Sequence, residues 1–302
     1  MARLLMLNAY NPSISVGSGG SYSAAELQAT LQKIFLNNIS MAVTPTELVS
    51  TLSKRSDVSV WFLSAGGSNI DIYRACKHAL LNEVKSVNIL VGRKNSKLSN
   101  LQNKYHYGNI VEAQLPCGKD GFLATNSLLA FSVIFFRAYC YVANKKTHLP
   151  KTISSLLRAT LKDFKTIEKL RFSLKGMWEM DCLHVIYSNK LKSVAVDIES
   201  KFIEAGLGSI HIADVRNFAH GRHQWFSKNF HKNGILCLST EEDKALSIKT
   251  LSLLPDSIQK ESIIFRDLYG AELIAGILLS IYFSGFRGEY KNIDPGRPGV
   301  PG

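Results

Sequence analysis

Short apolar runs alternate with longer segments of helical periodicity along most of the chain. Apolar runs of strand length include residues 58–63 (VSVWFL), 181–188 (DCLHVIYS) and 233–239 (NGILCLS). Each run is followed by a turn of small or polar residues and then by an amphipathic stretch. Buried strands that alternate with helices build layered α/β domains, so the pattern predicts mostly parallel sheets that are covered by helices.

The second half of the chain repeats the strand-and-helix plan of the first half. This similarity predicts an internal duplication, with one domain over residues 1–150 and a second over residues 151–290. Residues 291–302 include the Gly- and Pro-rich sequence DPGRPGVPG and are predicted to form a tail outside both domains. A chain of 302 residues is long enough for two domains that each bury a core.

The net charge of +12 indicates an anionic partner. Nucleic acid, a membrane surface and a phosphorylated small molecule all fit that charge. The Lys and Arg residues are scattered singly or in pairs such as Lys145 and Lys146, and they form no block that is typical of a nucleic-acid-binding tail. We therefore expect a small-molecule partner and keep nucleic acid as the weaker alternative.

Cysteine spacing and apolar run length suggest a cellular location. The five cysteines are never spaced as CxxC, which favours reduced thiols in a cytoplasmic protein and predicts neither a disulfide framework nor a metal site. The apolar runs 128–143 and 273–283 are shorter than the roughly 20 residues that span a bilayer, so we expect buried helices and no membrane contact.

Four aromatic side chains are interpreted as packed in the core, namely Trp61, Trp178, His184 and His211.

Two predicted strand-to-helix turns in the first half are rich in Gly and Ser, at residues 17–23 (GSGGSYS) and 64–69 (SAGGSN). A helix N-terminus has unpaired N–H groups and the positive end of the helix dipole, so such turns favour an anion. Either turn could be only a tight connection. In the first turn, Ser21 or Ser23 could cap the helix that follows. Neither has a complete dinucleotide or P-loop motif, so no cofactor is predicted. The candidate ligand-binding residues are Gly19, Gly20, Ser21, Ser64, Gly66, Gly67, Ser68 and Asn69.

Asp197, Lys201 and Glu204 fall on one stripe of a predicted helix, because residues three and four apart are neighbours. One interpretation is a surface ladder of ion pairs. The apolar segments on either side favour another, in which a buried Glu204 works with His220 of the following FAHGRH turn in proton transfer. In the same turn, Arg222 could bind an anion or lie on the surface.

The spacing of these residues resembles that of the double-domain SIS (sugar isomerase) family, which includes the isomerase half of glucosamine-6-phosphate synthase. In that family a Lys precedes a Glu by one helical turn, and a His follows the Glu by sixteen residues, as Lys201, Glu204 and His220 do here. GGSYS resembles the family's Gly-Thr-Ser-Tyr loop. LSAGGSNID resembles its Ser-x-Ser-Gly-Glu-Thr loop, although Gly66 and Asn69 replace hydroxyl residues.

A third segment, FLATNS, resembles the family's Val-Ala-Ser-Thr-Lys segment and adds two candidate ligand-binding residues, Thr125 and Asn126. Lys119 and Asp120 precede it and could form a polar rim of the pocket, which we favour, or only a turn before a helix.

The resemblance implies two tandem SIS-type, flavodoxin-like domains, each with three αβα layers and a mostly parallel sheet. It implies Glu204 as the base that moves a proton between the first two sugar carbons. It also implies His220 as the acid/base in ring opening and Lys201 as a supporting cation. The family's His often comes from the partner subunit, so a homodimer is expected.

Two hypotheses of function follow from the resemblance. The first is an enzyme that isomerises or cleaves a sugar phosphate or sugar adduct, in the manner of an isomerase or deglycase. The second is a non-catalytic module that binds a sugar phosphate or senses a nucleotide within a larger system, and it is suggested by the altered hydroxyl residues of the second loop.

Overall fold

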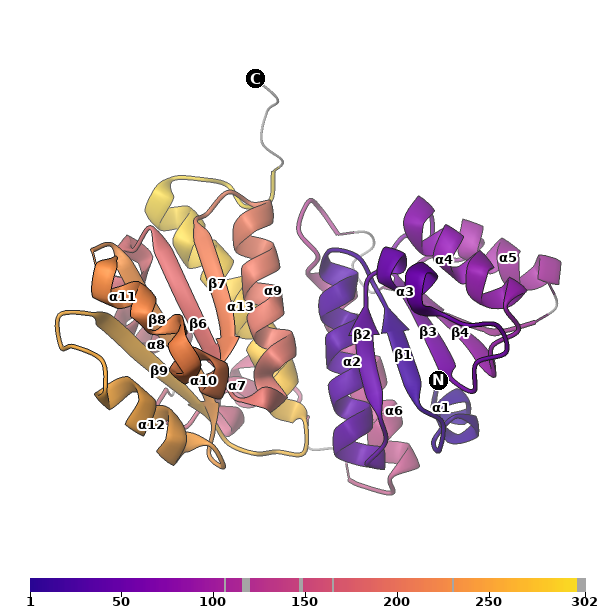
Figure 1. The fold of residues 1–302 in the computed structure, drawn as a ribbon, viewed down its shortest axis with the longest axis horizontal. Coiled ribbons are helices and arrows are strands. Elements are labelled where there is room, and N and C mark those ends of the chain that lie inside the picture. The colour runs from indigo at the N-terminus through magenta and orange to yellow at the C-terminus, as the bar shows by residue number, and fades with distance from the viewer. Residues whose placement is uncertain (106, 116–119, 147–148, 165, 230, 298–302) are drawn as a thin grey trace. The chain divides into compact units, whose positions relative to one another are not determined.

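The computed structural model describes residues 1–105, 107–115, 120–146, 149–164, 166–229 and 231–297. The chain divides into two compact units, residues 1–147 and residues 148–302. Figure 1 shows that each unit is built around its own sheet. Cys117, Lys119 and the last five residues of the predicted tail lie outside the described residues.

The first unit has a five-stranded parallel sheet in the order β2-β1-β3-β4-β5. Figure 1 shows α2 and α6 on one face of this sheet and α3, α4 and α5 on the other. The elements are α1 (Ala2–Leu7), β1 (Ser13–Val16), α2 (Gly20–Leu36), β2 (Ser40–Val43), α3 (Pro45–Thr51), β3 (Ser59–Ser64), α4 (Ile70–Leu81), β4 (Ser86–Val91), α5 (Lys97–Tyr105), β5 (Asn109–Glu112) and α6 (Asn126–Val142).

Strand β3 shows why this sheet needs helices on both faces. All six of its residues are buried, and successive side chains of a strand point to opposite faces. Val60 and Phe62 belong to the core cluster that includes Ile72 and Ala75 of α4. Trp61 points the other way and packs edge-on against Phe135 of α6, with 5.9 Å between the ring centroids. The predicted core position of Trp61 is thus confirmed.

The second unit has a four-stranded parallel sheet in the order β7-β6-β8-β9. Helices α9 and α13 lie on one face, and α10, α11 and α12 on the other (Figure 1). The elements are α7 (Ile153–Thr160), α8 (Ile167–Ser173), the 3-10 helix η1 (Lys175–Glu179), β6 (Cys182–Tyr187), the 3-10 helix η2 (Asn189–Leu191), α9 (Lys192–Glu204), β7 (Ser209–Asp214), α10 (Val215–Asn217), the π-helical turn η3 (Phe218–Arg222), α11 (Gln224–Lys228), β8 (Asn233–Thr240), α12 (Lys244–Ser252), β9 (Gln259–Phe265) and α13 (Ala271–Lys291).

Helix α13 is the main core helix of the second unit. By length and composition alone it could cross a membrane, but 78% of its most apolar window is buried inside the protein. Its two buried charged side chains bond to backbone: the Glu272 carboxylate accepts from the N–H groups of Leu268 and Gly270, and Arg287 Nε donates to the Leu207 carbonyl. The prediction that the run 273–283 forms a buried helix is confirmed.

The outer edge of β9 has a short additional pairing. Leu161, which follows α7, forms an isolated antiparallel bridge with Phe265. The backbone N–H of Lys162 donates to the Ile264 carbonyl, and that of Arg266 donates to the Thr160 carbonyl. The segment after α7 therefore covers the end of this edge strand.

Candidate functional site

The carboxyl ends of three strands in the first unit surround a cavity of about 500 Å³. In open parallel sheets, ligands bind in the crevice outside the carboxyl ends of the strands. The cavity is lined by residues that follow β3, β4 and β5, namely Ala65, Gly66, Ser68, Gly92, Arg93, Lys94, Gln114 and Leu115. Its position and volume suit a small-molecule ligand.

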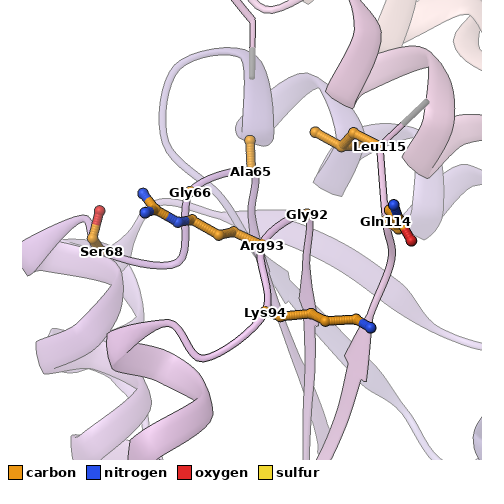
Figure 2. A pocket seen from close by; sticks show the side chains of 8 residues that line it. All are labelled: Ala65, Gly66, Ser68, Gly92, Arg93, Lys94, Gln114 and Leu115. Atoms are coloured by element: carbon orange, nitrogen blue, oxygen red, sulfur yellow. The ribbon is translucent and has the colours of Figure 1, made fainter. Parts of the chain in front are cut away.

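Two adjacent cations, Arg93 and Lys94, give this cavity its charge. Figure 2 shows the Arg93 side chain extending toward the Gly66 turn and Ser68, whereas the Lys94 side chain extends in the other direction, toward the segment with Gln114. Both side chains are exposed, and neither forms an ion pair with another described residue. They are therefore available for an anion.

Glu112 at the end of β5 holds the loop that carries the two cations. Its Oε1 accepts hydrogen bonds from the Ser99 hydroxyl at 2.6 Å and from the Asn95 backbone N–H at 3.0 Å. These bonds, with a smaller contribution from the charge of Lys94, lower the pKa of Glu112 below its ordinary value. The bracing carboxylate is thus ionised at neutral pH, and it fixes one side of the cavity.

The second predicted loop contributes to this cavity only in part. Gly66 and Ser68 line it. The Ser64 hydroxyl instead accepts from the Gly67 N–H at 3.1 Å, and the Asn69 side chain caps α4 by accepting from the Asp71 and Ile72 N–H groups. The Ser64 and Asn69 oxygens thus shape the turn, and the ligand contacts predicted for these two residues and for Gly67 stay a prediction.

The first predicted loop is a close-packed turn between β1 and α2. Helix α2 is preceded by Gly19, without a side-chain cap, so the prediction that Ser21 or Ser23 caps it was wrong. A Cβ atom on Gly20 would lie 2.1 Å from the Ala124 Cβ, so packing alone requires a glycine at this position. Gly19, Gly20 and Ser21 are not among the residues that line the cavity after β3, β4 and β5. Their ligand contacts stay a prediction.

The N-terminus of α6 is already occupied by a carboxylate of the chain. Asp120 accepts from the backbone N–H groups of Asn126 and Ser127 and from the Thr125 hydroxyl, at 2.6 to 3.2 Å. A second anion at the same N–H groups would meet the charge of Asp120. Asp120 thus caps α6 from the turn before this helix, and its place at a pocket rim stays a prediction. Thr125 and Asn126 donate to its carboxylate.

In the second unit, the predicted stripe of α9 is divided between core and surface. Lys201 Nζ lies 2.6 and 2.7 Å from the two carboxylate oxygens of Asp197, and both side chains are almost fully buried. Glu204, one turn later, is exposed and accepts a hydrogen bond from Ser200 at 2.6 Å. The prediction that Glu204 is buried was wrong, because Glu204 ends α9 on its solvent side, next to the exposed Ile203, while Lys201 and Phe202 of the same turn face the core.

The predicted imidazole and guanidinium lie in the π-helical turn after β7. His220 is exposed and shares no hydrogen bond or ion pair with Glu204 in the described part of the chain. Arg222 donates from Nη1 to the Ile212 carbonyl at 3.1 Å and lines a separate cavity on the second unit. The structure thus joins Lys201 to Asp197, not to Glu204, and the catalytic roles of Glu204 and His220 stay predictions.

Arg93, Lys94 and Gln114 were not identified from the sequence. The segment VNILVGRK has the pattern of a strand that ends in a polar loop, and this pattern alone indicates no ligand role. Two adjacent cations directly after a buried strand were the available signal, because that position faces the carboxyl edge of a parallel sheet.

Known proteins of the same architecture were found among solved structures. Tagatose-6-phosphate ketose/aldose isomerase from Escherichia coli matches 99% of this chain and 88% of its own, with a TM-score of 0.73 and 14% identity. The C-terminal domain of glucosamine-fructose-6-phosphate aminotransferase from Francisella tularensis matches 96% and 87%, with a TM-score of 0.67 and 12% identity. The chain therefore has the double-SIS fold.

A third structure, glucosamine-6-phosphate deaminase from Thermotoga maritima, matches 98% of this chain and 90% of its own, with a TM-score of 0.68 and 14% identity. No family model and no curated protein matches the sequence. The predicted fold class, two tandem α/β domains with parallel sheets, is confirmed. At these identities the likeness establishes the double-SIS fold.

Proposed function

We propose that the chain binds a phosphorylated sugar, or a sugar derivative with a comparable anionic group, in the cavity after β3, β4 and β5. The observation that carries the proposal is the pair Arg93 and Lys94, which form no ion pair with a described residue at the rim of a cavity of about 500 Å³. Sugar-phosphate chemistry in proteins of the same fold, named as isomerases and a deaminase of sugar phosphates, supports this ligand class.

The two cations differ in what they offer a phosphate. The planar Arg93 guanidinium can bind two phosphate oxygens at once, whereas Lys94 supplies a point charge. Ser68 and Gln114 line the same cavity and carry polar groups for sugar hydroxyls. The cavity thus combines a cationic part for the phosphate with polar groups for the sugar.

Binding is tested by thermal-shift and calorimetric titration with hexose 6-phosphates, aminosugar phosphates and the matching sugars without phosphate. We expect only phosphorylated ligands to raise the unfolding temperature. Arg93→Ala should weaken binding about tenfold or more, because a hydrogen bond to a charged group contributes about 1.5–3 kcal/mol. Lys77→Ala, which removes an exposed cation of α4, is the control and should bind as the wild type does. Equal binding of sugars with and without phosphate would contradict the proposal.

Isomerase activity is the second candidate, and the spacing of Lys201, Glu204 and His220 favours it. In this proposal the Glu204 carboxylate takes the proton from C2 of an open-chain aldose phosphate and returns it to C1 of the enediol. His220 exchanges the ring-opening proton, and a homodimer would supply it from the partner subunit.

Turnover of a sugar-phosphate panel by the wild type, Glu204→Gln and the neighbouring Glu199→Gln separates the two candidates. Loss of turnover in Glu204→Gln alone, with binding retained, supports catalysis. Wild-type protein that binds a sugar phosphate and never converts it would leave binding as the function. Analytical ultracentrifugation tests the homodimer.

A further inference from the structure

Three side chains with metal-binding atoms meet on the second sheet, beside the cavity that Arg222 lines. Cys182 Sγ and one ring nitrogen each of His184 and His211 lie within 4.8 Å of one another. The strand pairing explains this. Cys182 and His184 are two apart on β6 and so point to the same face, and His211 of β7 is the direct cross-strand neighbour of His184.

The two imidazoles lie on a face of the sheet whose neighbouring residues are hydrophobic. Ile186 of β6 and Ala213 of β7 continue the same rows and belong to the core cluster under α10 to α12. Phe226 packs on His184 with 4.5 Å between ring centroids, and Trp225 packs on His211 with 5.7 Å. The prediction that His184 is packed is confirmed, whereas His211 is exposed, because β7 is an edge strand.

His184 has a nitrogen that nothing in the described protein satisfies. Its side chain is 7% exposed, and its Nε2 has no hydrogen-bond partner among the described residues. Buried polar groups normally have a partner, so such a nitrogen calls for an explanation. Histidine is the commonest metal ligand in proteins, so a bound metal ion would give this nitrogen a partner.

We propose that Cys182, His184 and His211 bind a transition-metal ion of the zinc class. One thiolate and two imidazoles are a donor set that suits Zn²⁺, and sites with three protein ligands keep a fourth position open. Around one Zn²⁺ the donor atoms are about 3.3–3.6 Å apart, given bonds of about 2.0–2.3 Å in tetrahedral geometry. The donors here lie within 4.8 Å of one another, so they need to approach by up to about 1.5 Å, and rotation of the exposed His211 side chain would supply part of that movement.

The fourth position of this site would open into a cavity of about 330 Å³. That cavity is lined by His184, His211, Gly221, Arg222 and Trp225. A Zn²⁺ ion with one thiolate keeps a net positive charge, and Arg222 adds another, so the fourth ligand would be water, hydroxide or a small anion. The donors lie in the amino-terminal halves of β6 and β7, on the face of the sheet and not at its carboxyl edge.

The test uses the whole chain, stripped with a chelator and titrated with Zn²⁺ against a chromophoric competitor. Co²⁺ replaces Zn²⁺ in a parallel titration, because a thiolate ligand gives a charge-transfer absorption band. We expect one tightly bound ion per chain, a thiolate band that disappears in Cys182→Ser, and a rise in the unfolding temperature with Zn²⁺.

His211→Ala is the decisive variant, because the exposed side chain can be removed without disturbing the core. We expect its Zn²⁺ affinity to fall about a hundredfold or more, since even indirect partners of metal ligands contribute 10- to 100-fold. His231→Gln, an exposed histidine of the same unit, is the control and should keep wild-type affinity. A Co²⁺ spectrum without a thiolate band, or equal Zn²⁺ affinity in wild type and His211→Ala, would overturn the proposal.

Discussion

The buried pair of Asp197 and Lys201 allows a direct test of whether Lys201 serves the fold or the substrate. Both oxygens of Asp197 contact Lys201 Nζ, at 2.6 and 2.7 Å, and the two side chains are 0% and 3% exposed. Asp197→Asn leaves the ammonium group buried without its counter-ion. Breaking a buried pair in this way costs about 3–5 kcal/mol of unfolding free energy.

The size of the effect in a melting experiment follows from the size of the unit. For a unit of about 150 residues, 1 kcal/mol moves the unfolding temperature by about 2–4 °C. We therefore expect Asp197→Asn to lower the second-unit transition by about 6–20 °C in calorimetry. Replacing both residues, with Asp197→Leu and Lys201→Met, should restore most of the loss, because apolar residues of similar volume can replace a buried ion pair.

Glu204→Gln is the control on the same helix, and an exposed substitution of this kind should change the stability by less than about 0.5 kcal/mol. The structural role of Lys201 would be refuted by one result. If Lys201→Met unfolds within about 1 kcal/mol of the wild type but no longer binds or converts a sugar phosphate, Lys201 acts on the ligand.

Two further predictions concern the first unit. The pKa of Glu112 is lowered in the folded state, so its stabilisation is present above its ordinary pKa of about 4.3 and is lost as the pH falls through the folded value. In Glu112→Gln, the unfolding free energy measured by urea unfolding should therefore fall less steeply than in the wild type as the pH is lowered. An equal fall in both proteins would contradict the bracing role. Gly20→Ala should destabilise by about 1–3 kcal/mol in the same assay, because its Cβ would overlap that of Ala124. Gly285→Ala, where the new Cβ meets open space inside a helix, should be neutral or stabilising by up to about 1 kcal/mol, and equal losses at both glycines would reject the packing argument.

The fold was predictable because its signal is distributed along the chain. Strand β3, for example, is apolar at nearly every position, as both of its faces are buried. The two-fold repetition of strand and helix then restricts the arrangement to parallel layered sheets. No single residue decides this result, so local errors such as the wrong cap of α2 did not affect it.

The candidate site was less predictable, because residue type does not say which atoms are already engaged. Asn69 is a predicted ligand residue whose side-chain oxygen caps α4, and the Asp120 carboxylate accepts from the N-terminal N–H groups of α6. Lys201 and Glu204 share a helix stripe in sequence, yet the Lys201 side chain is buried in the core and the Glu204 side chain is exposed to solvent. His184 and His211 are 27 positions apart, and only the register of β6 and β7 brings them together.

The short bridge between Leu161 and Phe265 also bears on the solubility of the protein. Strand β9 is an edge strand of its sheet, and the backbone donors and acceptors of such an edge can recruit a strand from another molecule. The chain's own segment occupies the end of that edge, which shortens the stretch open to a foreign strand. A break in this contact would thus favour self-association of the protein.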